Sequence, residues 1–196
     1  QKDEWVIRRQ AEMLAAAGVD AIVCDNTNGT YTWADTINQM LKVFNDARAD
    51  GVDVPQIIFH LPFFEADSTV TQAKELYNKL YSREQYADNW FMWEGKPLII
   101  ASPDAFNKNN AEEAKILEYF TFRRGQPDYL EDQKVDEQWG WLSMYPQATY
   151  KKIRKNRKDP IEQMTVGVAQ NHDYVAKQLT AMNGDNVTGR TYTSKG

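Results

Sequence analysis

The sequence has one cysteine, Cys24, and only two histidines in 196 residues. A single cysteine cannot form an internal disulfide, so a disulfide-stapled scaffold is excluded. The histidines and the cysteine have none of the close spacings of a zinc site, and we expect neither a metal nor another cofactor. A glycine-rich phosphate loop of either common type is also missing, so nucleotide binding has no support.

Long apolar runs and an excess of basic charge are absent as well. No apolar stretch approaches the roughly 18 to 20 residues that span a bilayer, so we expect no membrane span. The 23 basic and 28 acidic residues give a net charge of -5, which does not favour nucleic acid as a partner. One run, 151–158, has six basic residues in eight, and we interpret it as a solvated connecting helix.

What is present is an alternation of two kinds of apolar segment. Short β-branched runs are typical of strands covered on both faces, and they lie at 19–24, 56–59 and 96–101. Apolar residues at helical spacing predict four helices, before residue 18, at 37–47, from 68 onward and at 111–118. We expect Asp3 to cap the first helix and Ser68 or Thr69 to cap the third.

This order predicts a parallel sheet built from right-handed crossovers. Further strands are expected at 119–123, 139–143 and 163–168. Six parallel strands suit an incomplete barrel or an open doubly wound sheet, and we favour an α/β fold of the (β/α)8 TIM-barrel type. A complete barrel takes about 250 residues, and this chain opens inside a helix. We therefore expect residues 1–196 to form a single barrel domain that is truncated at both ends.

Polar and aromatic side chains follow the expected strands. In parallel β/α folds, ligands bind where loops leave the carboxyl ends of the strands. A carboxylate, amides, a guanidinium and aromatic rings together are typical of a sugar site, since hydroxyls need donors and acceptors and pyranose faces pack on rings. We expect Asp25 and His60 to be catalytic. The expected substrate-binding residues are Asn26, Arg123, Trp141, Tyr145, Gln170, Asn171 and His172.

Structural roles remain open for several of these residues. Asp25 can cap the turn after its strand, because Asp side chains bond local backbone N–H groups. His60 precedes Leu-Pro and can be a buried structural histidine. Cys24 lies in an apolar strand, which favours a core residue over a nucleophile.

The tryptophans divide into two groups. Trp139 and Trp141 occupy alternate positions of one expected strand and are candidates to line a cleft. The others are expected to be packing residues: Trp5, Trp33, Trp90 and Trp93.

Several motifs resemble one known group of proteins. They lie at 4–8, 17–20, 24–29 (Cys-Asp-Asn-Thr-Asn-Gly), 90–98 (Trp-Phe-Met-Trp-Glu-Gly-Lys-Pro-Leu), 140–147, 165–171 and 189–192. Over nearly its whole length the chain resembles glycoside-hydrolase-like barrels of carbohydrate-degrading Bacteroidetes. It is more distantly similar to glycoside hydrolase families 99 and 71 and to WbsX-like glycosyltransferases.

The resemblance implies a (β/α)8 barrel that acts on an oligosaccharide or polysaccharide outside the cytoplasm, in the periplasm, at the cell surface or secreted. In such proteins a later strand ends in an Asn-Glu pair whose glutamate is the natural second catalytic carboxylate, and this sequence ends at Gly196 without it. We therefore expect a glycoside hydrolase or a fragment of one. A non-catalytic carbohydrate-binding barrel and a glycosyltransferase remain as alternatives.

Overall fold

The structure, a computed structural model, describes residues 3–63, 66–125, 133–140 and 148–166, and the backbone of residues 172–173 and 178–179. The chain divides into two compact units, Gln1–Phe122 and Arg123–Gly196. The expectation of a single domain stays a prediction.

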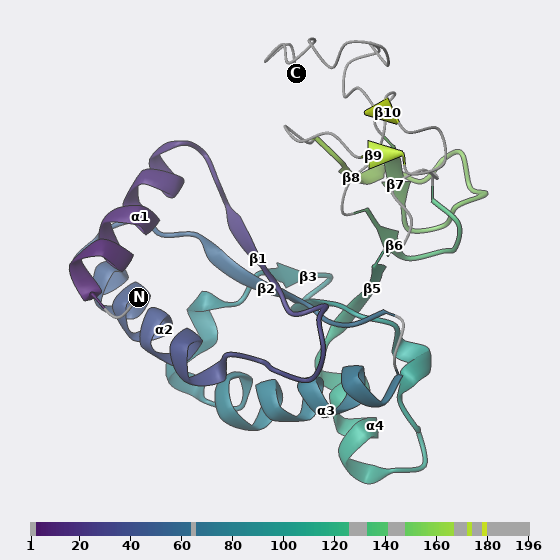
Figure 1. Ribbon diagram of the computed structural model, residues 1–196, viewed down its shortest axis with the longest axis horizontal. Coiled ribbons are helices and arrows are strands. Elements are labelled where there is room, and N and C mark those ends of the chain that lie inside the picture. Colours follow the sequence, from purple (N-terminus) through teal and green to yellow (C-terminus); the bar gives the residue numbers. More distant parts are fainter. Residues whose placement is uncertain are drawn as a thin grey trace. The chain divides into compact units, whose positions relative to one another are not determined.

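The first unit alternates helices and strands (Figure 1). Its α-helices are α1 (Glu4–Ala16), α2 (Ala34–Ala49), α3 (Ala66–Leu76) and α4 (Ala111–Tyr119). Its strands are β1 (Ala21–Asp25), β2 (Gln56–His60), β3 (Met92–Trp93), β4 (Lys96–Ile100) and the start of β5 (Thr121–Gly125). Three short helical segments complete it: the π-helical η1 (Tyr77–Tyr81) and the 3₁₀-helical η2 (Glu84–Asn89) and η3 (Pro103–Ala105).

Local capping explains where several helices begin. The Asp3 carboxylate accepts a hydrogen bond from the Val6 N–H at 3.2 Å, which confirms the expected cap of α1. Asn110 caps α4 in the same way, accepting from the N–H groups of Glu112 and Glu113. The prediction for the third helix is wrong. Because α3 already begins at Ala66, Ser68 and Thr69 lie buried inside its first turns rather than at a cap.

The strands form a curled parallel sheet in the order β1-β2-β4-β5-β6, which is a half-barrel. β1 and β2 pair in parallel from Ala21 opposite Gln56 to Asp25 opposite His60, and β2 pairs in parallel with β4. The short β3 adds to β4 in an antiparallel ribbon. The α/β prediction is confirmed and an incomplete barrel fits this sheet, whereas the complete TIM barrel stays a prediction.

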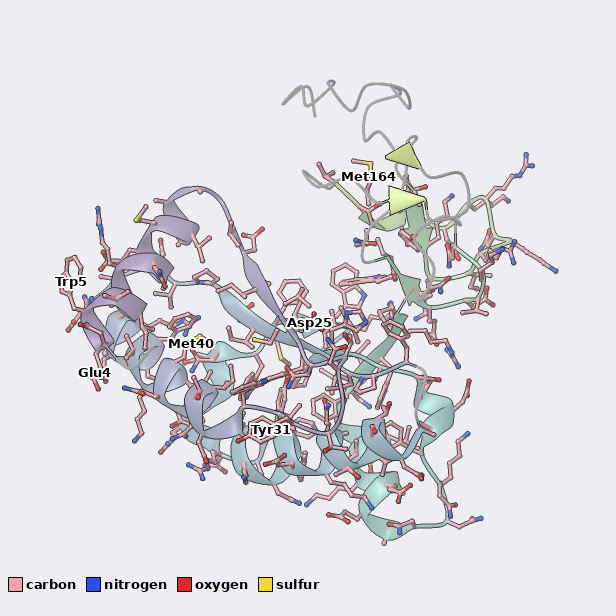
Figure 2. All side chains as sticks on the ribbon, viewed as in Figure 1. Glu4, Trp5, Asp25, Tyr31, Met40 and Met164 are labelled. Atoms are coloured by element: carbon pink, nitrogen blue, oxygen red, sulfur yellow. The ribbon has the colours of Figure 1, made fainter. Side chains whose placement is uncertain are left out.

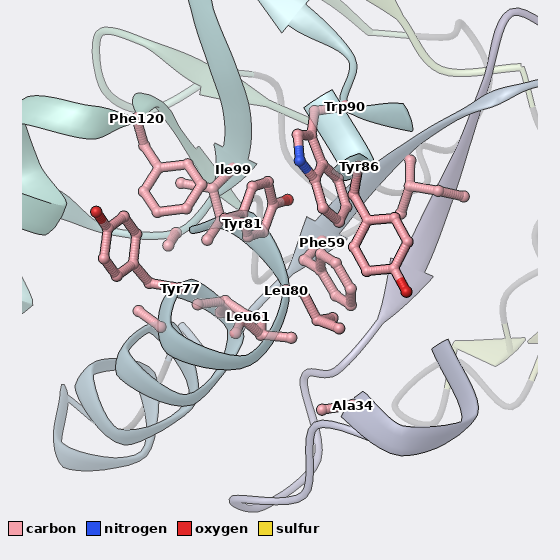
Figure 3. Packing of buried hydrophobic residues seen from close by; sticks show 14 of the residues in the cluster. Ala34, Phe59, Leu61, Tyr77, Leu80, Tyr81, Tyr86, Trp90, Ile99 and Phe120 are labelled. Carbon is pink, nitrogen blue, oxygen red and sulfur yellow. The ribbon is translucent and has the colours of Figure 1, made fainter. Parts of the chain in front are cut away.

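The main core lies between this sheet and its helices. Tyr81 of η1 stacks on Trp90 with ring centroids 4.0 Å apart, and it meets Phe59 and Phe120 edge-on (Figure 3). Trp90 is fully buried, which agrees with the packing role expected for it. Edge-to-face and offset ring contacts stabilise such clusters beyond the burial of their apolar area.

The second unit is built differently from the prediction. β6 (Gln138–Trp139) pairs in parallel with the end of β5, but β8 (Ile161–Met164) pairs antiparallel with β7 (Thr149–Lys151). The strand expected at 163–168 is therefore not a sixth parallel strand. The basic run is not a helix either, because Lys151 ends β7 and residues 152–159 form turns. Beyond these, the backbone of β9 (His172–Asp173) pairs antiparallel with β10 (Gln178–Leu179).

Candidate functional site

Asp25 and His60 are cross-strand partners at the carboxyl ends of β1 and β2. The Asn26 N–H extends the pairing by donating to the His60 carbonyl at 2.9 Å. Along β2, Ile57 and Phe59 belong to the core under the helices, and Cys24 packs against that core from β1. Because side chains alternate along a strand, Asp25 and His60 both leave the opposite face of the sheet. The structure thus brings the two expected catalytic residues together.

The Asp25 side chain is exposed and takes part in a local turn (Figure 2). Its Oδ1 accepts hydrogen bonds from the Thr27 N–H at 3.0 Å and from the Thr27 hydroxyl at 2.8 Å. This is the capping role that Asp side chains take after strands. Both bonds hold the carboxyl group in a fixed direction at the carboxyl end of β1, so the Asp25 side chain has a structural role there.

His60 is only 2% exposed, and its ring lies 5.6 Å from that of Phe63. Burial lowers the pKa of His60 to about 4, while the negative charge of Asp25 acts in the opposite direction. The imidazole is therefore neutral at pH 7. A neutral imidazole has one donor nitrogen and one acceptor nitrogen, and in His60 both are shielded from solvent.

Asn26 begins a loop that buried amides hold in place. Its side chain is buried, and Nδ2 donates to the Tyr31 carbonyl at 3.1 Å. Gln72, fully buried on α3, donates through Nε2 to the carbonyls of Asn26 at 2.9 Å and Gly29 at 2.7 Å. Sequence reasoning missed Gln72. A polar residue on the buried stripe of α3, directly before Ala73, was the signal that could have identified it.

Arg123 belongs to the second unit and is 1% exposed. Its Nε and Nη2 each donate to Glu162 at 2.8 Å, a bidentate ion pair. The Trp139 Nε1–H also donates to Glu162, at 3.0 Å. Trp139 is buried, so it packs inside the second unit rather than lining an open cleft. The ion pair with Glu162 gives the Arg123 guanidinium a structural partner within the second unit.

The remaining expected site residues lie outside the described part of the chain or are described only as backbone. Trp141, Tyr145, Gln170 and Asn171 are not among the described residues, and His172 is described only as the first residue of β9. Their expected roles in substrate binding stay predictions.

In the first unit, the structure agrees with the expectation for Cys24 and contradicts the one for Trp5 and Trp33. Burial raises the pKa of Cys24 to about 11, as expected for a core thiol and not for a nucleophile. Trp5 and Trp33 were expected to be packing residues, but they are 72% and 59% exposed. Trp5 lies on the outer side of α1, and Trp33 comes directly before α2.

Within the described ranges, no three His, Cys, Asp or Glu side chains gather in a way that could hold a metal ion. None of the described helices is long and apolar enough to cross a membrane. The chain matches no protein-family model, no curated protein and no solved structure. Function is therefore inferred from the residues at the carboxyl ends of the strands.

Proposed function

We propose that this protein is a glycoside hydrolase whose Asp25 supplies one carboxylate of the acid/base chemistry. The observation that carries the proposal is the pairing of Asp25 with His60 on one face of a curled parallel sheet, at the carboxyl ends of neighbouring strands. In parallel β/α barrels this end of the sheet is where ligands bind. The resemblance of the 24–29 and 90–98 motifs to glycoside-hydrolase-like barrels supports the same conclusion.

The chemistry assigns distinct roles to the two residues. Hydrolysis of a glycosidic bond needs a carboxylic acid that protonates the leaving oxygen and a second carboxylate that acts as base or nucleophile. Asp25 is exposed and held by Thr27, so we assign it to this pair. His60 is neutral at pH 7 and has both ring nitrogens buried, so its role is to support Asp25 from the neighbouring strand rather than to contact the sugar. The resemblance implies that the second carboxylate belongs to the Asn-Glu pair of such barrels.

The test compares Asp25→Asn with Asp20→Asn. Asp20 is also exposed but comes directly before β1, at the opposite end of the same strand. Asp25→Asn is expected to lower turnover about 10²- to 10⁴-fold, the usual contribution of a general acid or base. Asp20→Asn is expected to behave as the wild type. The measurement is the release of reducing ends from a panel of soluble polysaccharides.

Unchanged turnover in Asp25→Asn, on a glycan that the wild type cleaves, contradicts the proposed role of Asp25. Thermal melting of both variants provides the control for folding. It distinguishes a loss of chemistry from a loss of the turn that Asp25 and Thr27 form.

A second candidate function is carbohydrate binding without turnover. The observation that favours it is the engagement of Asp25 Oδ1 by both Thr27 donors, which gives this carboxylate a structural use independent of catalysis. Saturable binding of an oligosaccharide in calorimetry, with no release of reducing ends by the wild type, would support this function over hydrolysis.

A further inference from the structure

The loop between β1 and α2 presents two aromatic side chains to solvent. Tyr31 is 67% exposed and Trp33 is 59% exposed, and their ring centroids lie 4.8 Å apart at an interplanar angle of 69° (Figure 2 labels Tyr31). The rings thus contact each other edge-to-face while large parts of both stay in water. Exposed neighbouring aromatic groups on a soluble surface often mark a binding site.

Hydrogen bonds from two buried side-chain amides hold the backbone of this loop in place. Asn26 and Gln72 hold the carbonyls of Asn26, Gly29 and Tyr31 through buried amide donors. Trp33 itself has a φ of 57°, a left-handed conformation that non-glycine residues rarely adopt. A position that favours glycine instead carries the largest side chain, turned toward solvent. This combination indicates a preorganised aromatic surface.

The two rings border a hollow of about 380 Å³ in the first unit. Its other walls come from the loop residues Thr30 and Thr32, from Asp35 and Thr36 in the first turn of α2, and from Glu75 and Lys79 of the following helical segments. Lys79 Nζ lies 2.7 Å from Glu75 Oε1. This ion pair, together with a hydrogen bond from Thr32, lowers the pKa of Glu75, so the carboxylate and the ammonium offset each other.

We propose that this hollow is a second binding site for carbohydrate, one that takes a neutral polysaccharide chain. Aromatic faces pack against the C–H faces of pyranose rings, and hydroxyl, carboxylate and ammonium groups supply the donors and acceptors that sugar hydroxyls need. Glu75 and Lys79 form an ion pair and Asp35 adds a further carboxylate to the lining, so the hollow favours a neutral ligand over a polyanion. The inference rests on the proposed function only in its choice of a polysaccharide as ligand.

The test uses Trp33→Gly and Tyr31→Ala, with Trp5→Ala as the matched control. Glycine accepts the left-handed backbone at position 33 without strain, so Trp33→Gly is expected to fold as the wild type does. Trp5 is even more exposed, at 72%, but lies on α1, outside the lining of the hollow. Migration of each protein is measured in native gels that contain starch, galactomannan, xylan, α-mannan or, as the anionic comparison, polygalacturonate.

We expect at least one neutral glycan to retard the wild type. Trp33→Gly and Tyr31→Ala should each weaken the apparent Kd about tenfold, the loss expected for one ring contact. Trp5→Ala should be retarded like the wild type. Equal retardation of Trp33→Gly and Trp5→Ala overturns the site, as does retardation of the wild type by polygalacturonate alone.

Two further measurements separate this inference from the proposed hydrolysis. Loss of turnover in Asp25→Asn without loss of retardation in Trp33→Gly supports hydrolysis and overturns the second site; the reverse pattern supports the second site alone. Gel filtration over a range of concentrations tests whether a second copy of the chain, rather than a glycan, binds the two rings. Self-association that Trp33→Gly abolishes would show that the rings contact a second copy of the chain instead of a glycan.

Discussion

At the scale of single residues, His60 has the most unusual environment. Its imidazole is buried at the end of β2, beside the exposed carboxylate of Asp25 on the neighbouring strand. Burial lowers its pKa to about 4, and Asp25 limits that decrease. The pair therefore combines a buried neutral imidazole with an exposed carboxyl group at one edge of the sheet, and the carboxyl group is the part that a ligand can reach.

The titration of His60 is predicted to follow from this burial. Its pKa in the folded protein is about 4, against about 6.5 in the unfolded chain, so the unfolded state binds the proton more tightly. Above pH 6.5 the imidazole is neutral in both states, and its burial does not lower the free energy of unfolding. As the pH falls from 6.5 toward 4, the unfolded chain takes up a proton that the folded protein does not, so the free energy of unfolding decreases; at pH 5 the decrease is about 2 kcal/mol. NMR titration of the imidazole, with His172→Gln to remove the other histidine signal, measures this pKa.

Asp25→Asn should lower the pKa of His60 further, because it removes the nearby negative charge, whereas Asp20→Asn should leave it unchanged. A pKa near 6.5 in the wild type would contradict the burial of this histidine.

At the scale of elements, η1 and η2 each contribute a buried tyrosine to the core, and the two hydroxyl groups differ in their hydrogen bonding. Both Tyr81 and Tyr86 are buried (Figure 3). The Tyr86 hydroxyl donates to Asn38 Oδ1 at 2.7 Å. The Tyr81 hydroxyl has no hydrogen-bond partner among the described residues, and burial raises its pKa well above the usual value. The two hydroxyls thus make opposite contributions to stability.

Removal of each hydroxyl is predicted to have a different effect. Tyr86→Phe should lower the free energy of unfolding by about 1 kcal/mol, because it leaves Asn38 without this donor. Tyr81→Phe should be neutral or stabilising, because it removes a buried polar group that has no partner in the described chain. Urea denaturation of the two variants measures both effects. Equal destabilisation by the two substitutions would contradict this difference.

The elements also show which features the sequence could predict. β-branched runs bounded by turn residues were sufficient to locate β1, β2 and β4, because strands buried on both faces have a distinct composition. β8 was misinterpreted because its antiparallel pairing with β7 depends on contacts between strands, which periodicity does not encode. The exposure of Trp33 was missed for a related reason, since hydrophobicity alone predicts burial and the left-handed backbone directs the ring outward.

At the scale of the whole molecule, the candidate site depends on topology more than on any single side chain. Asp25 and His60 are 35 positions apart in sequence, and they become neighbours because the crossover through α2 returns the chain to a parallel strand. The rule that ligands bind at the carboxyl ends of such strands allowed this pair to be predicted. The ion pair of Arg123 could not be predicted, because Glu162 lies 39 residues further along the chain.

The most direct test of the central claim, that carbohydrate binds at the carboxyl ends of β1 and β2, is an NMR titration of the labelled chain. The ligand is an oligosaccharide prepared from the glycan that retards the wild type, and Trp33→Gly serves as the protein so that the loop hollow does not contribute. Saturable shifts of the Asn26 and Thr27 amides and of the His60 imidazole are predicted. Saturable binding that leaves these three signals unchanged, or no binding at all, would contradict it.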